Sequence, residues 1–183
     1  MEVLHLDPAI ALLLRVCLAT LFGLAAFHKV RDRHAFLETF ANHEILPRAL
    51  TLPGAAFVVV AELLVFLGLV GGFPGPQAGT ATLALLGLYT LALAINLVRG
   101  RREIDCGCLG PDNRQPLSAW MIWRNLVLAL GALALFLPVA NRPFVFVDAI
   151  TLLGGFLVLS LLFQAANQLA GQPRPTRQGV HST

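Results

Sequence analysis

The chain has 183 residues, of which 57% are hydrophobic and only 13% are charged. Soluble domains average about one charged residue in four, and here the charges gather in short stretches between long apolar runs. This composition excludes an ordinary soluble domain. The formal net charge of +3 is interpreted as a signal of membrane topology, with no nucleic acid as a partner.

Five apolar runs follow one another along the chain, and each is long enough to cross the hydrocarbon core of a bilayer, which takes about 20 residues. The predicted spans are Ala9–Phe27, Ala55–Phe73, Ala78–Val98, Ala119–Val139 and Phe144–Ala166. Leucine and alanine dominate these runs, which favours helices over the short alternating strands of a membrane barrel. The predicted fold is therefore an all-α polytopic membrane helix bundle of five transmembrane helices, embedded in a lipid bilayer.

The polar stretch between the first two spans is long enough to hold structure of its own. Phe36, Leu37 and Phe40 fall on one helical face, a pattern typical of a short amphipathic helix lying on the membrane surface. Such a helix either binds the interface or only seals the edge of the bundle. Pro47 and Pro53 then mark the entry into the second span.

The domain organisation is predicted to be simple. Residues 1–170 form a single transmembrane helical domain. Residues 171–183 are rich in Pro, Arg and Gln and have no apolar pattern, so this tail is expected to be disordered.

Five spans place the two termini on opposite sides of the membrane. Loops Val30–Pro53 and Arg99–Leu117 then share one side with the C-terminal tail, and loops Pro74–Gln77 and Ala140–Pro143 share the other. The first side carries most of the basic residues, whereas the second has only Arg142 in its loops. Because cytoplasmic loops are enriched in Lys and Arg, the sequence predicts a bacterial inner (cytoplasmic) membrane protein whose third loop faces the cytoplasm.

Two cysteines, Cys106 and Cys108, lie one residue apart in this basic third loop. Gly107 between them tolerates positive φ, so the backbone can turn sharply enough for the thiols to pair. So small a ring is expected to strain a disulfide, and strain makes a disulfide easier to reduce. The spacing favours thiol–disulfide exchange over a static brace, which would close too short a loop to add much stability.

Other interpretations of the cysteines stay open. A soft-metal site is the main rival, because two thiolates suit Cu(I) or Zn(II); a closed zinc site takes four ligands, and His28, His34 or His43 could contribute from the same side. The third cysteine, Cys17, lies within the first span. It is either a small apolar core residue or part of a relay that carries oxidising equivalents across the bilayer.

Ionisable residues within the spans form a second candidate group. A charge inside the membrane is costly and usually faces the bundle interior with a partner. Glu62 falls near the middle of the second span, and counting depth from the span ends brings both Arg15 and Arg124 within reach, so a Glu62–Arg ion pair is predicted. Asn125 is a polar companion. Lys29, at the interface end of the first span, is expected to extend to the lipid headgroups.

Several common signatures are missing from the sequence. It contains no Walker loop, no GxGxxG, no zinc-protease helix and no plausible Ser/His/Asp set. ATP use and hydrolase activity are therefore not expected, and no cofactor is evident.

Four pieces of the sequence recur in one order in a known family. They are Gly23 to Val30, ending in His-Lys-Val; Leu46-Pro47 followed by Glu62; Arg99-Gly100-Arg101 leading into Cys106-Gly107-Cys108-Leu109-Gly110; and Trp123-Arg124-Asn125-Leu126. This series resembles the MauE family of methylamine-utilisation membrane proteins, within the wider MauE/DoxX group. Leu109 stands where the family usually has Phe.

The resemblance implies a redox-associated membrane protein that works with MauD, a thioredoxin-like partner, in forming the disulfides of the methylamine dehydrogenase small subunit. It also implies a four-helix core like that of DoxX and of VKOR (vitamin K epoxide reductase). Enzymes of the latter kind use quinone acceptors, but nothing in this sequence marks a quinone site. A MauD-type partner works outside the cytoplasm, whereas the charge pattern places the cysteine loop inside.

The resulting hypothesis is an integral membrane thiol–disulfide redox protein. Its reacting residues are Cys106 and Cys108, and its supporting residues are Gly107, Glu62, Arg124, Lys29 and Asn125. The alternatives are a non-catalytic scaffold for a redox partner and a cysteine-based Cu/Zn relay.

Overall fold

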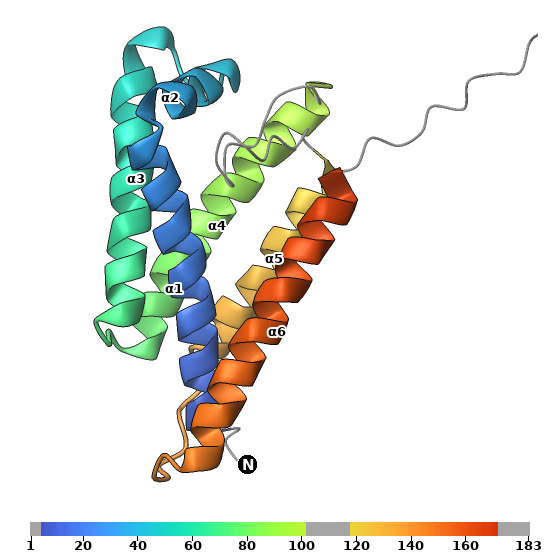
Figure 1. The fold of residues 1–183 in the computed structure, drawn as a ribbon. Coiled ribbons are helices and arrows are strands. Elements are labelled where there is room, and N and C mark those ends of the chain that lie inside the picture. Colours follow the sequence, from blue (N-terminus) through green and yellow to red (C-terminus); the bar gives the residue numbers. More distant parts are fainter. Residues whose placement is uncertain (1–4, 102–117, 172–183) are drawn as a thin grey trace, which may run out of the picture.

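The computed structural model describes residues 5–101 and 118–171 of the chain. The helices of this part are α1 (Pro8–Arg31), α2 (Arg33–Asn42), α3 (Arg48–Val70), α4 (Gly75–Val98), α5 (Ala119–Ala134) and α6 (Phe146–Gly171), as Figure 1 shows. Apart from an isolated bridge between Leu6 and Val139, these residues hold no β-structure. The all-α prediction is confirmed.

Four of the helices are long and apolar enough to cross a membrane, namely α1, α3, α4 and α6. The fourth predicted span, Ala119–Val139, is a helix only as far as Ala134, and this helix has 16 residues. At 1.5 Å per residue it covers about 24 Å, less than the hydrocarbon core of about 30 Å. Pro138 explains the early end, because proline disfavours helical geometry in the residue before it. A crossing by this segment stays a prediction.

The long helices alternate in direction. Figure 1 places α2, the last residues of α4, the start of α5 and the end of α6 at one end of the bundle, which we call the α2 end. The N-terminus, the α3–α4 turn and the α5–α6 link lie at the opposite end. The described parts of these segments therefore group at two ends as expected, whereas residues 102–117 and the C-terminal tail lie outside the described residues. The side of the membrane that each end faces stays a prediction.

The segment between the first two spans is more helical than predicted. α1 continues to Arg31 and α3 already begins at Arg48, so Pro53 lies inside a helix instead of ending a loop. Pro47 occupies the N-cap of α3. The helix expected around Phe36 is present as α2, which packs against α3; its binding to the membrane surface stays a prediction.

Glycine ends α4 in a defined way at the α2 end. Gly100 has a φ of 74°, in the left-handed region. Its N–H donates to the carbonyl of Leu97, and the N–H of Arg101 donates to the carbonyl of Asn96, both at 3.0 Å. This pair of bonds is a Schellman motif. It sets the direction in which the chain leaves α4 at Arg101.

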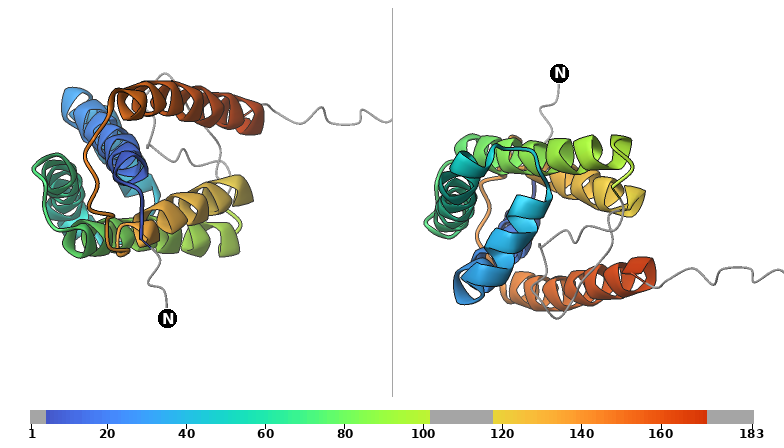
Figure 2. Two further views of the ribbon diagram at one scale, coloured as in Figure 1. Left: turned by 90° about the horizontal axis from the view of Figure 1, so that it is seen from below. Right: turned by 90° about the horizontal axis from the view of Figure 1, so that it is seen from above.

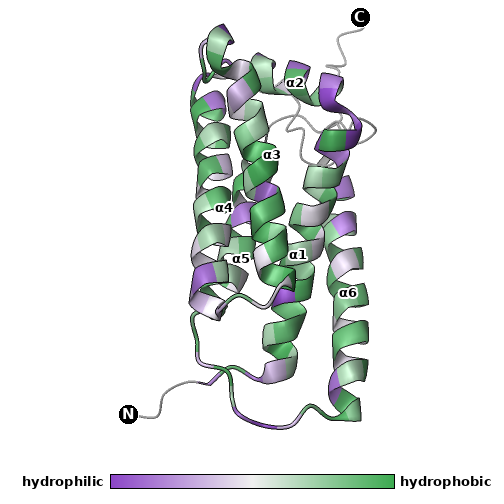
Figure 3. Ribbon diagram, turned by 90° about the vertical axis from the view of Figure 1, so that its left-hand side faces the viewer, coloured by the Kyte–Doolittle hydropathy of each residue, from purple (hydrophilic) through white to green (hydrophobic). Residues whose placement is uncertain are grey.

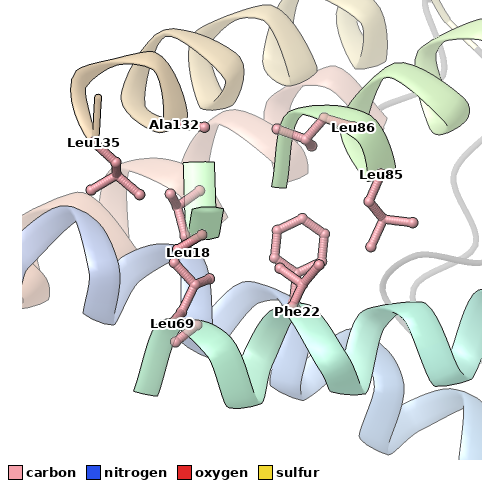
Figure 4. Close-up of a cluster of buried hydrophobic side chains, with 10 residues drawn as sticks. Leu18, Phe22, Leu69, Leu85, Leu86, Ala132 and Leu135 are labelled. Carbon is pink, nitrogen blue, oxygen red and sulfur yellow. The ribbon is translucent and has the colours of Figure 1, made fainter. Parts of the chain in front are cut away.

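The apolar core lies where α1 meets α3, α4 and α5. Figure 4 shows its central side chains. They are Leu18 and Phe22 of α1, Leu69 of α3, Leu85 and Leu86 of α4, Ala132 of α5 and Leu135 at the C-cap of α5. Views from the two ends show α1 between α3 and α6, with α4 and α5 running together along one side (Figure 2). α4 and α5 approach closely because Gly79 faces the carbonyl of Ala132; a Cβ at Gly79 would lie 3.0 Å from that oxygen.

The outer faces of the helices are also apolar. Figure 3 shows hydrophobic residues along most of the helix lengths and hydrophilic residues around α2. Leu153 and Leu161 of α6 are 67% and 65% exposed. Large exposed apolar surfaces mark contact with a membrane or another apolar partner. Together with the four long apolar helices, they indicate a multi-pass membrane protein.

Candidate functional site

A buried ion pair joins α1 and α3. The Nζ atom of Lys29 lies 2.5 Å from Oε1 of Glu62, and the two side chains are 4% and 0% exposed. Removing two charges from water costs several kcal/mol for each ion, and their attraction offsets this only when further polar contacts are present. The surroundings of the pair therefore decide how stable it is.

Two aromatic residues complete the surroundings of the pair. The hydroxyl of Tyr89, on α4, donates to the same Oε1 atom of Glu62. The Lys29 ammonium lies 5.5 Å from the ring centroids of both Phe36 and Tyr89, at cation–π distance. The ion pair and its two aromatic neighbours thus connect α1, α2, α3 and α4. Tyr89 did not stand out in the sequence, because a single tyrosine in an apolar run has no local signature.

The prediction that an arginine pairs with Glu62 is wrong. Lys29 occupies the place expected for an arginine, and it is buried instead of extending to the headgroups. Arg15 donates to the backbone carbonyl of Phe73 at 2.5 Å, at the opposite end of the bundle. Depth along a span says how far a residue lies from the membrane surface, but the packing of α1 on α3 decides which residues face each other.

The ion pair forms part of the wall of a cavity of about 370 Å³. All six helices contribute to its lining, and most of the lining side chains are apolar. Its polar residues include Lys29, Glu62, Tyr89, Arg124 and Asn125. Four of the predicted supporting residues therefore meet around one cavity, although they come from three separate helices.

Arg124 and Asn125 belong to the α5 side of the cavity. Nη1 of Arg124 donates to Oδ1 of Asn167 on α6 at 3.3 Å, and its guanidinium carbon lies 5.8 Å from the ring centroid of Phe163. Nδ2 of Asn125 donates to the hydroxyl oxygen of Thr90 at 3.2 Å. Within the described ranges, Oε2 of Glu62 and Nε of Arg124 are buried without a hydrogen-bond partner.

The predicted reacting residues lie outside the part of the chain that the structure describes. Cys106, Gly107 and Cys108 fall in the stretch 102–117, outside the described residues. Cys17 is a free, half-buried thiol on α1. His28 and His43 both line the cavity, but residues 5–101 and 118–171 contain no group of three or more His, Cys, Asp or Glu placed to hold a metal ion.

Arg101, the last described residue before the stretch 102–117, is hydrogen-bonded to the α2–α3 link. Nη2 of Arg101 donates to Oε2 of Glu44, in the link between α2 and α3, and Nη1 of Arg99 donates to the Glu44 carbonyl at 3.1 Å. The hydrogen bond from Arg101 holds the pKa of the exposed Glu44 carboxyl below its ordinary value. These contacts join the exit from α4 to the α2–α3 link.

A second charged cluster lies at the opposite end. Arg142 binds Asp7 through two hydrogen bonds of 2.9 and 2.8 Å and Asp148 through two of 2.7 Å. Asp7 also caps α1 by accepting from the N–H of Ala9 at 2.8 Å. The hydrogen bonds from Arg142 lower the pKa of Asp7. The cluster ties the N-terminal segment to the α5–α6 link, and the sequence interpretation treated Arg142 only as a topology signal.

The fold and the cavity define a class: a multi-pass helical membrane protein with a buried Lys–Glu pair facing an apolar cavity. The chain belongs to the MauE family, since the family model described as "Methylamine utilisation protein MauE" matches residues 7–138. This confirms the resemblance seen in the sequence.

Curated relatives agree with the family match. The chain is 40% identical over 170 residues to Methylamine utilization protein MauE of Paracoccus versutus, covering 91% of this chain and 90% of the relative. It is 37% identical over 168 residues to the protein of that name from Paracoccus denitrificans, with the same two coverages. The Methylophilus methylotrophus protein is 30% identical over 175 residues, covering 94% and 92%. No solved structure matches the chain.

Proposed function

We propose that this protein serves methylamine utilisation as a membrane-embedded thiol–disulfide exchange protein. Cys106 and Cys108 cycle between dithiol and disulfide with a thioredoxin-fold partner of the MauD type. The client is a protein whose disulfides must form, such as the small subunit of methylamine dehydrogenase. The names of the relatives support the pathway, and the sequence resemblance supports the partner.

The observation that carries this proposal is the pair of thiols placed one residue apart between two anchored residues. The stretch that contains Cys106-Gly107-Cys108 begins after Arg101 and ends before Ser118. Arg101 is bound to Glu44, and the N–H of Met121 on α5 donates to the carbonyl of Ser118 at 3.1 Å. Both anchors lie at the α2 end, where exchange with a partner would take place.

The exchange conserves atoms and electrons. A thiolate of the reduced partner attacks one sulfur of the Cys106–Cys108 disulfide, which forms a mixed disulfide and releases the other cysteine as a thiolate. The second thiol of the partner then resolves the mixed disulfide. The partner leaves oxidised, and the cysteine pair leaves reduced by two electrons and two protons. The reverse sequence would reduce the partner and restore the disulfide. Net disulfide formation in a client therefore requires a two-electron acceptor, such as a membrane quinone, to reoxidise the reduced pair.

The buried Lys29–Glu62 pair supports such a site by fixing the helices beneath it. Lys29 lies two residues before the end of α1, and Tyr89 connects the pair to α4. These contacts hold together the described helices at the α2 end, from which the cysteine-bearing stretch leaves. Arg124 and Asn125, near the start of α5, hold the neighbouring helix by contacts with Asn167 and Thr90.

The proposed location is the bacterial inner membrane with the cysteine pair on the cytoplasmic side. The basic residues of Val30–Pro53 and Arg99–Leu117 support this orientation. Labelling intact cells with a membrane-impermeant maleimide, in a Cys17→Ser background, tests it. Labelling of Cys106 or Cys108 in intact cells would place the pair outside and reverse the assignment.

Thiol trapping followed by mass spectrometry tests the exchange itself. Acid-quenched cells should contain both the reduced and the disulfide form of the pair, and Cys108→Ser should accumulate a mixed disulfide with a thioredoxin-fold protein. Cys17→Ser is the matched control and should leave the cycle unchanged. A pair that stays reduced at every redox poise and never forms a mixed disulfide contradicts the proposal.

The two alternatives give different results with the same variants. A scaffold that only holds a redox partner keeps its activity in Cys106→Ser and Cys108→Ser. A Cu or Zn relay shows stoichiometric metal in the purified protein, which both serine variants lose.

A further inference from the structure

Arg124 carries a positive charge that no carboxylate neutralises among the described residues. Its hydrogen-bond partner there is the neutral amide of Asn167, and its guanidinium lies against the ring of Phe163. Its Nε atom is buried and has no hydrogen-bond partner in residues 5–101 and 118–171. A guanidinium in such apolar surroundings is costly unless a counter-charge balances it, so this environment is suited to an anionic ligand.

The Lys, Arg, Asp and Glu side chains of the described cavity lining add up to one excess positive charge. Lys29 and Glu62 compensate each other at 2.5 Å, which leaves Arg124 as the uncompensated ion of the described lining. A ligand with a single negative charge matches this balance. A phosphomonoester would bring a second charge into an apolar wall, and a buried charge without a partner costs several kcal/mol.

The mouth of the cavity faces the apolar outer surface. Leu24, Phe57 and Leu88 line the cavity and yet are 53%, 63% and 41% exposed. They belong to α1, α3 and α4, which are candidate membrane spans. A molecule entering past these side chains would therefore come from the acyl region of the bilayer, with an apolar body of its own.

We propose that this cavity binds a long-chain monocarboxylate drawn from the membrane. Its carboxylate pairs with the guanidinium of Arg124. The guanidinium donates to the two carboxylate oxygens in the planar bidentate geometry that such pairs favour. Its alkyl chain lies against the apolar lining, including Leu21 and Leu128. The cavity volume of about 370 Å³ falls in the usual range for small-ligand sites, about 300–1,000 Å³. Ligand binding here needs neither Cys106 nor Cys108, so it does not rest on the proposed thiol exchange.

Fluorescence of cis-parinarate, a conjugated fatty acid, tests the site with the purified full-length protein in detergent, after subtraction of empty micelles. The probe should bind saturably, and oleate should displace it at least tenfold better than methyl oleate, which has the same chain without the charge. Arg124→Gln should weaken binding at least tenfold. Arg15→Gln, which removes an intramembrane arginine outside this cavity, should bind as the unmodified protein does.

A second variant covers the case in which Arg124→Gln does not fold. Ala25 lines the cavity, and Ala25→Phe should fill it and abolish saturable binding while Arg124 is kept. Cys106→Ser with Cys108→Ser should bind normally, which separates this site from the exchange reaction. Equal displacement by oleate and methyl oleate, or unchanged binding in a folded Arg124→Gln or Ala25→Phe protein, overturns the proposal.

Discussion

Lys29 and Glu62 are 33 positions apart in the sequence, and their charged atoms lie 2.5 Å apart inside the bundle. The pair lies where α1 and α3 pack along each other, and it is closed off by Phe36 and Tyr89. A buried ion pair specifies which helix faces meet, because a rotation of α1 would carry the Lys29 ammonium away from Glu62 and leave both charges without a counter-charge. Disturbing this pair is therefore the most direct test of the fold.

Glu62→Gln should lower the free energy of unfolding by about 3–5 kcal/mol, because the Lys29 ammonium would stay buried without a counter-charge. Denaturation in mixed detergent and dodecyl sulfate micelles measures the change. Glu38→Gln, at an exposed glutamate of α2, is the matched control and should change it by at most about 0.5 kcal/mol. Lys29→Met combined with Glu62→Met should recover most of the loss; a double variant as unstable as the single one would contradict this account.

Tyr89→Phe should cost about 1–2 kcal/mol, since it deletes the hydroxyl that donates to Glu62 and leaves the ring that contacts Lys29. The same denaturation experiment measures it. In a Glu62→Gln background the substitution should cost clearly less, because the charged acceptor is already gone. Costs that simply add in the double-mutant cycle would show that the two groups do not interact.

Gly79→Leu should destabilise the packing of α4 on α5 by about 1–3 kcal/mol, the usual cost of forcing extra volume into a filled interface. A Cβ at Gly79 would lie 2.7 Å from the Phe136 ring and 3.0 Å from the carbonyl oxygen of Ala132. Gly87, on the same helix, has nothing within 4 Å of that position. Gly87→Leu is therefore the control and should leave the unfolding midpoint nearly unchanged; equal effects would argue against close α4–α5 contact.

Asp7→Asn should reduce the dependence of stability on pH in the acid range. Because Arg142 lowers the folded-state pKa of Asp7, the unfolded chain binds its proton first, and stability falls as the pH drops below about 4. The contribution is fully present above that range. Asparagine can still cap α1, so the change isolates the ion pair.

Unfolding midpoints at pH 3, 5 and 7 measure this effect. Asp32→Asn is the control, because Asp32 is exposed at the N-cap of α2 and its side chain makes no cap hydrogen bond. An Asp7→Asn protein that loses as much stability as the unmodified protein between pH 5 and pH 3 would show that the Arg142 cluster does not contribute.

The sequence predicted where the helices lie along the chain more accurately than it predicted where they begin and end. The first, second, third and fifth predicted spans correspond to α1, α3, α4 and α6, because apolar runs of span length have no other stable form in a membrane. The ends shifted where prolines lie. Pro53 is accommodated inside α3, whereas the chain leaves its helix before Pro138. The effect of a proline depends on which neighbours can satisfy the freed carbonyls.

At the candidate site, too, the sequence predicted some features and the tertiary structure decided others. Composition and the length of the apolar runs determined that this is a helical membrane protein, and the motifs from Gly23 to Asn125 determined its family. Only the tertiary structure decided that Lys29 is the partner of Glu62, that Tyr89 joins them, and that Arg142 holds two aspartates at the opposite end. Burial in a membrane depends on residue type along the chain, but ion pairing depends on which helix faces meet, and that is a property of packing between distant segments.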